Sequence, residues 1–273
     1  MVLLTNEAVR MEQVTEVYGE GKTRLMVATG SPGELGLLKA ISELFVRDND
    51  AAIAWVKAGT GRSLSLLKTC RADLALVHVP LEKQSIVFVD TGLKRSIIGG
   101  NEFYLVGPTH DPAQVRYAHS IEDAYSRIAE SHSPFISRGD DSGTHQTEMA
   151  IWHRTKYHPR GDWYLISHDF MTATLLLANS RSAYFMLDSS TWAVEKLRAS
   201  NLSLLYRGDY TLLNPYYVFI RNSQTSEEEK LAKKFKTFLT SMRGQQLIGA
   251  FGCDVFNAPL YHGASFIRNQ LEP

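Results

Sequence analysis

The sequence has little of what marks a disulfide framework, a zinc module or a membrane span. Its 273 residues include two cysteines, Cys70 and Cys253, too few for a disulfide framework and too far apart for a zinc motif. Apolar stretches such as 86–89 and 175–178 last only a few positions, whereas a membrane-spanning helix needs about 20 apolar residues. We therefore expect inert cysteines and no insertion into a membrane.

An excess of charge of one sign is also missing. Lysine plus arginine and aspartate plus glutamate each count 29, so no bulk positive charge attracts nucleic acid or an acidic membrane. The first residues, MVLLTNEAVR, show no basic segment followed by an apolar run, which predicts a cytoplasmic protein or one whose leader has been removed. With 44% hydrophobic and 21% charged residues, the composition is that of an ordinary globular protein.

The sequence alternates between patterns that are typical of strands and patterns that are typical of helices. Short apolar strands are expected at 24–28, 52–57 and 74–79. Helical spacing of apolar residues follows, for example from Leu37 to Phe45. Three such units in the first hundred residues predict a parallel sheet covered by helices.

The same alternation continues to the end of the chain. Further strands are expected at 102–107, 135–137, 163–166, 183–187, 204–206 and 217–220, and helices near Ser142, Met171 and Ser189. Ser120 and Asp123 resemble a capping box that opens another helix. A charged amphipathic helix follows residue 228, with Gly244 at its end, and the tail after Pro259 is expected to be irregular.

Four strand ends carry small hydroxylated or glycine residues at the start of a helix, at 29–31, 59–61, 137–144 and 171–174. Helix N-termini present unpaired N–H groups and a partial positive charge, and hydroxyls add donors. Each loop alone is explained by helix capping. Four together predict a donor-rich site for an anion.

The most informative stretch is SRGDDSGTH, residues 137–145. Arg138 follows a strand end, where its guanidinium can offer a fork of donors to an oxyanion. The alternative is a local ion pair between Arg138 and one of the two aspartates, and both can hold if the aspartate orients the arginine. The serine and glycine that follow add a hydroxyl and a backbone N–H.

A hydrolase is the enzymatic alternative, because Ser142 and His145 lie three residues apart on one helix face. A nucleophile elbow requires G-x-S-x-G, and this segment reads D-D-S-G-T. A triad also needs a group that orients the base and an oxyanion hole. The nine histidines show no metal-binding spacing. We predict no catalysis, no metal ligands and no cofactor.

These segments resemble the tungstate-binding proteins of bacterial ABC importers, a branch of the type II periplasmic solute-binding proteins. The matching segments are ATGSPGELGLL (28–38), KAGTG (57–61), ADLALVHVP (72–80), NEFYLVGPTHDPA (101–113), SRGDDSGTH (137–145), GDWYL (161–165), MTATL (171–175), YFMLDSSTW (184–192) and LLNPY (212–216). They follow in order from about residue 24 to 251, and SRGDDSGTH is the most specific of them.

The resemblance implies a two-lobed α/β protein in which each lobe is a mainly parallel sheet flanked by helices. The oxyanion would lie in the cleft between the lobes and pass to an ABC permease. Lobe 1 would comprise 22–101 and 210–260 and lobe 2 would comprise 102–209, with 1–21 and 261–273 peripheral. We expect a monomer, periplasmic or in the cell envelope if a leader was removed. The alternative is a cytoplasmic oxyanion-sensing effector domain of a regulator.

The ligand shell implied by the resemblance and the loop chemistry consists of Thr29, Gly30, Ser31, Thr60, Gly61, Ser137, Arg138, Ser142, Gly143, Thr172, Ala173 and Thr174. The first loop departs from the family pattern of consecutive threonines, because Ala28 and Gly30 leave out two hydroxyls. A cage made only of donors accepts a fully deprotonated dianion, whereas hydrogen phosphate would turn its proton toward donors. Tungstate, molybdate and sulfate meet this requirement.

Overall fold

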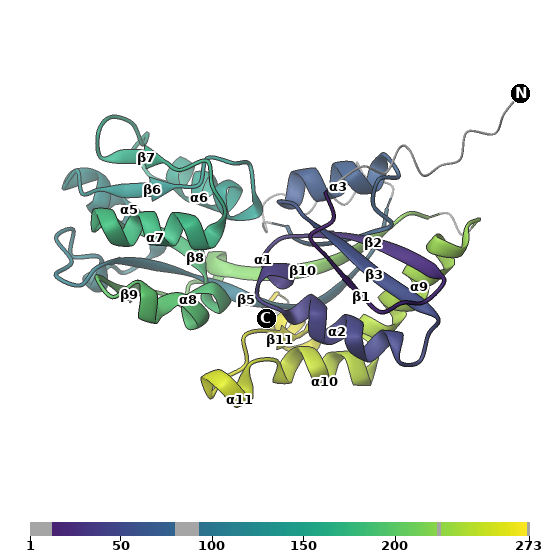
Figure 1. The fold of residues 1–273 in the computed structure, drawn as a ribbon. Coiled ribbons are helices and arrows are strands. Elements are labelled where there is room, and N and C mark those ends of the chain that lie inside the picture. Colours follow the sequence, from purple (N-terminus) through teal and green to yellow (C-terminus); the bar gives the residue numbers. More distant parts are fainter. Residues whose placement is uncertain (1–12, 80–92, 223–224, 272–273) are drawn as a thin grey trace, which may run out of the picture. The chain divides into compact units, whose positions relative to one another are not determined.

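The computed structural model describes residues 13–79, 93–222 and 225–271, and the chain forms two compact units (Figure 1). Unit 1 contains the described residues of Met1–Val77, Ile86–Ile98 and Tyr216–Leu247, and unit 2 those of His78–Ser85, Gly99–Pro215 and Ile248–Pro273. The sequence-based division differs from this one at the described residues 78–79, 99–101, 210–215 and 248–260, which it groups with lobe 1, and at 261–271, which it leaves peripheral. The apolar stretch 86–89 and residues 1–12 of the segment predicted to be peripheral lie outside the described residues.

Unit 1 is built on a largely parallel sheet. Its first strands are β1 (Glu16–Tyr18), β2 (Thr23–Thr29), β3 (Ala51–Lys57) and β4 (Leu74–His78). They stand in the order β1-β3-β2-β4, followed by β10 (Leu213–Ile220) and β5 (Lys94–Pro108), two strands that continue into unit 2. β2 pairs in parallel with β3 and β4, whereas β1 is antiparallel to β3. The three strands predicted in the first hundred residues are confirmed, and β1 adds an edge strand that the sequence did not indicate.

The helices of unit 1 pack on this sheet through their apolar faces. They are α1 (Ser31–Glu34), α2 (Leu37–Val46), α3 (Thr60–Lys68), α9 (Glu227–Thr240) and the first part of α10 (Met242–Ala250). Phe45 of α2 meets Phe235 of α9 edge-on, with ring centroids 4.9 Å apart. α9 opens with a capping box between Ser226 and Glu229.

The predicted end of the amphipathic helix at Gly244 is wrong. α9 ends at Thr240, and Gly244 lies inside α10. The reason is Ser241, whose hydroxyl accepts the Gly244 N–H at 3.2 Å and whose carbonyl accepts the Gln245 N–H at 2.9 Å, so it starts a new helix.

Unit 2 combines parallel and antiparallel pairing. Besides parts of β5 and β10, its strands are β6 (Phe135–Ser137), β7 (Tyr164–Ile166), β8 (Phe185–Asp188), β9 (Leu202–Tyr206) and β11 (His262–Gly263). β5 is antiparallel to β8, β9 and β11. β6 is parallel to β7, and Phe135 forms a parallel bridge with Tyr184. The strands predicted at 135–137, 163–166, 183–187 and 204–206 are confirmed within one or two residues, whereas β5 begins at Lys94, eight residues before the predicted start at 102.

The helices of unit 2 are α5 (Ile121–Glu130), α6 (Gly143–Arg154), α7 (Met171–Arg181), α8 (Ser189–Glu195), α11 (Cys253–Phe256) and α12 (Ala264–Leu271), with 3-10 turns at Val115–Tyr117, Lys196–Arg198 and Tyr210–Leu212. Of these helices, α5 and α6 pack on an aromatic core. Ser120 caps α5 as predicted, accepting the Asp123 N–H at 3.1 Å. Trp152 lies at the centre of the core, its ring centroid 4.5 Å from that of Tyr125 and 5.5 Å from that of Phe135.

The tail after Pro259 is not irregular, which corrects the sequence-based expectation. β11 adds to β5, and α12 buries Ala264 and Ile267. Gly99 and Gly100 of β5 make this possible: a Cβ on Gly100 would lie 2.9 Å from an Ile267 methyl carbon, and one on Gly99 2.4 Å from the His262 carbonyl oxygen.

Within the described residues, none of the helices combines the length and the apolar character that crossing a membrane requires. Groups of three or more histidine, cysteine, aspartate or glutamate side chains able to hold a metal ion are likewise absent from these residues. Cys70 and Cys253 are both free thiols.

Candidate functional site

Unit 1 brings together its two predicted loops. β2 and β3 end at the same sheet edge, where Thr29 stands opposite Lys57 and the Ala58 N–H donates to the Thr29 carbonyl at 2.9 Å. α1 begins at Ser31 and α3 at Thr60. Two helix N-termini therefore open at the carboxyl edge of the sheet, the arrangement that suits an anion.

Thr29 does not offer its hydroxyl to this edge. The side chain is fully buried, and its hydroxyl donates to the Leu76 carbonyl at 2.8 Å. This hydrogen bond links β2 to β4. The hydroxyl hydrogen that was predicted to bind an anion is therefore already donated to a carbonyl of the protein. In α3, the first intrahelical bond runs from the Ser63 N–H to the Gly59 carbonyl at 2.9 Å, which leaves the N–H groups of the first turn without intrahelical acceptors.

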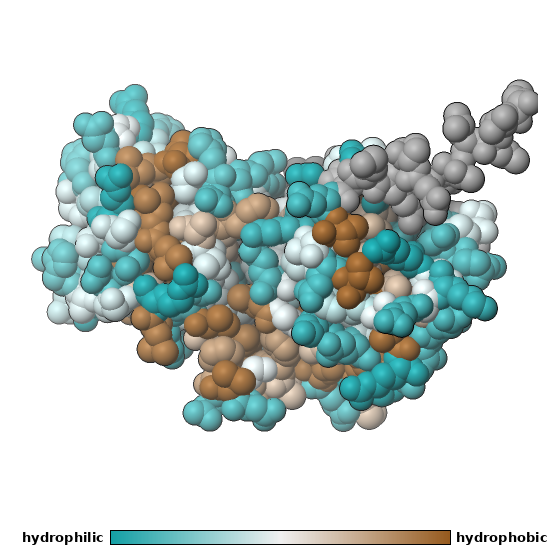
Figure 2. All heavy atoms as spheres, viewed as in Figure 1, coloured by the Kyte–Doolittle hydropathy of each residue, from teal (hydrophilic) through white to brown (hydrophobic). Residues whose placement is uncertain are grey.

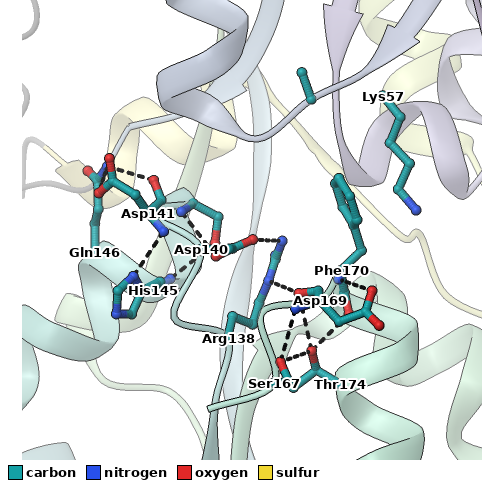
Figure 3. A network of polar contacts seen from close by, with 12 residues as sticks. Lys57, Arg138, Asp140, Asp141, His145, Gln146, Ser167, Asp169, Phe170 and Thr174 are labelled. Atoms are coloured by element: carbon teal, nitrogen blue, oxygen red, sulfur yellow. Dashed lines mark hydrogen bonds and ion pairs between the residues drawn. The ribbon is translucent and has the colours of Figure 1, made fainter. Parts of the chain in front are cut away.

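Unit 2 brings its two predicted loops together in the same way. β6 and β7 are in register, with Ser137 opposite Ile166. Beyond the strands, the Ser167 N–H donates to the Ser137 carbonyl and the His168 N–H to the Arg138 carbonyl, both at 2.9 Å. The loops therefore run side by side into α6 and α7 (Figure 3). Gly139 makes this close approach possible, because its φ is +61° and a Cβ would lie 2.1 Å from an Ile166 methyl carbon.

Arg138 joins the two loops of unit 2 (Figure 3). Its side chain is 6% exposed. Nε donates to the Asp169 carbonyl at 3.2 Å, Nη2 donates to the Asp140 carboxylate, and the guanidinium carbon lies 5.7 Å from the centre of the Phe170 ring. Nη1 makes no hydrogen bond to any residue in the described part of the chain. The guanidinium is thus held by three neighbours with one nitrogen left to donate.

The two aspartates of the loop serve the protein itself. Asp140 accepts the Ser142 N–H at 3.1 Å through Oδ1 and Arg138 through Oδ2. Asp141 accepts the Gln146 side-chain amide at 3.0 Å. The predicted ion pair of Arg138 with an aspartate is confirmed. Both carboxylates are engaged by donors of the same loop and its helix.

The helices that follow these loops differ in what they offer. Ser142 caps α6 and accepts the His145 N–H at 3.3 Å. Thr174 of α7 is fully buried, and its hydroxyl bonds the Phe170 carbonyl at 2.9 Å and the Ser167 hydroxyl at 2.8 Å. Its hydroxyl is therefore internal, like that of Thr29. Thr172 is half-buried and Ala173 is exposed in the first turn of α7.

The sequence indicated the aspartate that pairs with Arg138 but not the other two residues that hold it. Asp169 and Phe170 act through a backbone carbonyl and a ring face, and neither role leaves a motif. Their position just before the MTATL segment is the one signal that marks them. Glu148, which is buried behind this loop, was also missed. A single polar residue in a helix gives no sign in the sequence that its side chain will be buried.

Gly143 packs against His78, and this contact yields a prediction. A Cβ at position 143 would lie 2.2 Å from the Cδ2 atom of the His78 ring. We expect Gly143→Ala to lower the free energy of unfolding by about 1–3 kcal/mol, the usual cost of overpacking. Urea denaturation measures the change. The control is Gly249→Ala in α10, where the nearest atom to a new Cβ is 3.9 Å away. Equal stability of both variants would contradict the contact.

Paired helix N-termini at strand ends and a fixed arginine define an anion-binding α/β protein. His145 does not act as the base of a triad through Nδ1, which accepts the Asp141 N–H at 3.0 Å. The family model described as the PBP superfamily domain matches residues 16–243. The chain belongs to the PBP superfamily, and its predicted α/β periplasmic-binding-protein fold is confirmed.

Particular relatives are described as tungstate-binding proteins. The tungstate-binding protein TupA of Peptoclostridium acidaminophilum is 33% identical over 241 residues, covering 87% of this chain and 84% of that protein. The structure described as the tungstate ABC transporter from Geobacter sulfurreducens has a TM-score of 0.74 and 30% identity, covering 85% and 100% of the two chains. TupA from Desulfovibrio alaskensis G20 has a TM-score of 0.72 and 29% identity, covering 88% and 98%.

Proposed function

We propose that this chain is the solute-binding protein of an ABC importer, that it captures tungstate with molybdate as a second ligand, and that it delivers the oxyanion to a membrane permease without catalysis. It acts as a monomer in the periplasm or cell envelope. The relatives' descriptions support the ligand and the partner. The single observation that carries the proposal is Arg138, a nearly buried guanidinium with Nη1 available beside two helix N-termini.

We propose the same residues as predicted from the sequence, except that Thr29 and Thr174 support the site and do not contact the ligand. In unit 2 the donors are the Arg138 guanidinium, the Ser137 hydroxyl and the first turns of α6 and α7, which include Ser142, Gly143, Thr172 and Ala173. Thr174 supports the loop. In unit 1 the donors belong to residues 30–31 and 60–61, with Thr29 as a support. A Gly30 N–H takes the place of one hydroxyl that the family pattern contains.

The two aspartates of the loop accept hydrogen bonds from the protein itself, and this supports selection of a fully deprotonated dianion. A hydrogen phosphate needs an acceptor for its proton, and an acceptor without a donor partner favours it. Asp140 accepts through both oxygens from its own loop, and Asp141 accepts from Gln146. Tungstate and molybdate require only donors, so this loop favours them over phosphate.

A thermal-shift panel at fixed pH tests the function. A ligand at about 100 times its dissociation constant stabilises the folded state by roughly 2.7 kcal/mol, which moves the unfolding midpoint by several degrees. We expect large shifts with tungstate and molybdate and a small one with phosphate, and the shift with sulfate measures how far the site discriminates between dianions by their size. A shift with phosphate as large as that with tungstate would contradict the dianion argument. No shift with any of the four would contradict the proposed function.

A further inference from the structure

A buried carboxyl group lies behind the Arg138 loop. Glu148, in the second turn of α6, is 2% exposed. Its Oε1 accepts the Tyr164 hydroxyl at 2.7 Å and the Trp152 indole N–H at 3.3 Å. Neither a lysine nor an arginine of the described ranges pairs with this carboxyl.

Ser137 connects this carboxyl to the proposed site. Its hydroxyl oxygen is fully buried, adjoins the Glu148 carboxyl and the Tyr164 hydroxyl, and makes no hydrogen bond of good geometry within the described residues. Arg138 is the next residue in the chain. The Ser137 hydroxyl therefore adjoins a buried carboxyl and belongs to the residue that immediately precedes Arg138.

The surroundings of Glu148 disfavour its charged form. Desolvation by burial is the main reason that its pKa is raised to about 7; hydrogen bonds from Tyr164, Ser137 and Trp152 oppose this rise, and the charge of Asp140, from the loop after β6, adds to it. The other titratable groups facing it are Tyr164 from β7 and Tyr125 from α5, and burial raises the pKa of both phenols, which keeps them neutral. An ion without a cationic partner in such a site is costly, so protonation is the way to remove the charge.

We propose that Glu148 is a positioning residue for the oxyanion: it holds a proton behind Ser137, turns the Ser137 hydroxyl toward the ligand, and, where it starts out ionised, makes capture of the oxyanion take up a proton from solvent. The inference rests on the proposed function. With Glu148 protonated, its O–H donates to Ser137 Oγ, and the Ser137 hydrogen points outward as a donor. With Glu148 ionised, the Ser137 hydrogen is drawn to the carboxylate, and the lone pairs of its oxygen face the anion.

The pH dependence follows from linkage between the two binding events. The form that binds is the protonated one, so below pH 7 no proton has to be added and the affinity is constant. As the pH rises above about 7, the affinity falls by up to tenfold per pH unit while uptake approaches one proton per anion. His78 adds nothing here, because burial lowers its pKa to about 3 and it stays neutral.

Isothermal titration of the whole chain with sodium tungstate at pH 7.0 and about pH 8.5, in two buffers of different ionisation enthalpy, counts the protons. The wild type should take up protons and bind more weakly at the higher pH. Glu148→Gln keeps a donor toward Ser137, so it should bind at least as tightly at both pH values, with the Glu148-dependent proton uptake gone. Ser137→Ala should bind more weakly at both.

Glu130→Gln is the matched control, since Glu130 also accepts a tyrosine hydroxyl at 2.7 Å, from Tyr157, but at the surface. It should reproduce the wild-type proton count. Equal proton counts for the wild type and Glu148→Gln would overturn the inference and leave the proposed function intact. Absence of heat and of any thermal shift with tungstate in the wild type would instead defeat the proposed function.

Discussion

Replacing Arg138 by alanine is expected to raise the dissociation constant for tungstate by about 30- to 4,000-fold, because truncating a buried, hydrogen-bonded charged group at a binding site typically costs about 2–5 kcal/mol and each 1.4 kcal/mol is tenfold. The guanidinium is held by Asp169, Asp140 and Phe170 with Nη1 available. The variant loses the donor and leaves the Asp140 carboxylate beside the anion without its partner. Isothermal titration at fixed pH and salt measures the effect.

Two further variants separate binding from folding. Arg138→Lys keeps the charge but loses the fork of donors, so its affinity should lie between those of the wild type and the alanine variant. Arg198→Ala removes an arginine that pairs with Glu195 at the surface, at 2.8 Å, and should leave binding unchanged. A dissociation constant for Arg138→Ala within threefold of wild type, in a folded protein, would show that the site is elsewhere.

The largest effect on stability is expected from Arg221, at the end of β10. Its guanidinium donates to the carbonyls of Ala72 and Leu67 at 2.6 and 3.2 Å and lies 3.3 Å from the carboxylate of Asp73. Asp73 is 1% exposed. Removing Arg221 leaves that charge buried, and breaking a buried pair from one side costs roughly 3–5 kcal/mol. We expect a loss of this size for Arg221→Ala in urea denaturation.

The control for this prediction is Arg243→Ala, also in unit 1. Arg243 pairs with Asp48, but both side chains are more than half exposed, and exposed pairs contribute about 0–1 kcal/mol. The two alanine variants should therefore differ by several kcal/mol. Similar losses for both, or a loss below about 1 kcal/mol for Arg221→Ala, would contradict the buried network.

The sequence predicted the loops of the site because their signals are local. A strand that ends in glycine and hydroxyl residues before a helical pattern marks a helix N-terminus wherever the rest of the chain goes. Whether a hydroxyl remains available for a ligand depends on contacts with other parts of the chain. Thr29 is used by a carbonyl 47 residues away, and the hydroxyl of Thr174 is used by the Ser167 loop, so neither of these assignments could be read from composition.

Long-range packing also explains the errors in the fold. The tail after Pro259 forms β11 and α12 because β5 provides an edge and glycines that admit them. Glu148 reads as one polar residue of a helix, yet its neighbours come from β6 and β7. Burial of this kind depends on partners that periodicity within one helix does not specify.

Anomalous scattering from tungsten in crystals grown with tungstate tests the central claim most directly. We expect one strong tungsten peak at the N-termini of α6 and α7, with the oxygens of the tungstate ion within hydrogen-bond distance of Arg138 Nη1. A well-ordered tungsten peak elsewhere, with the Arg138 loop empty at saturating tungstate, would contradict it.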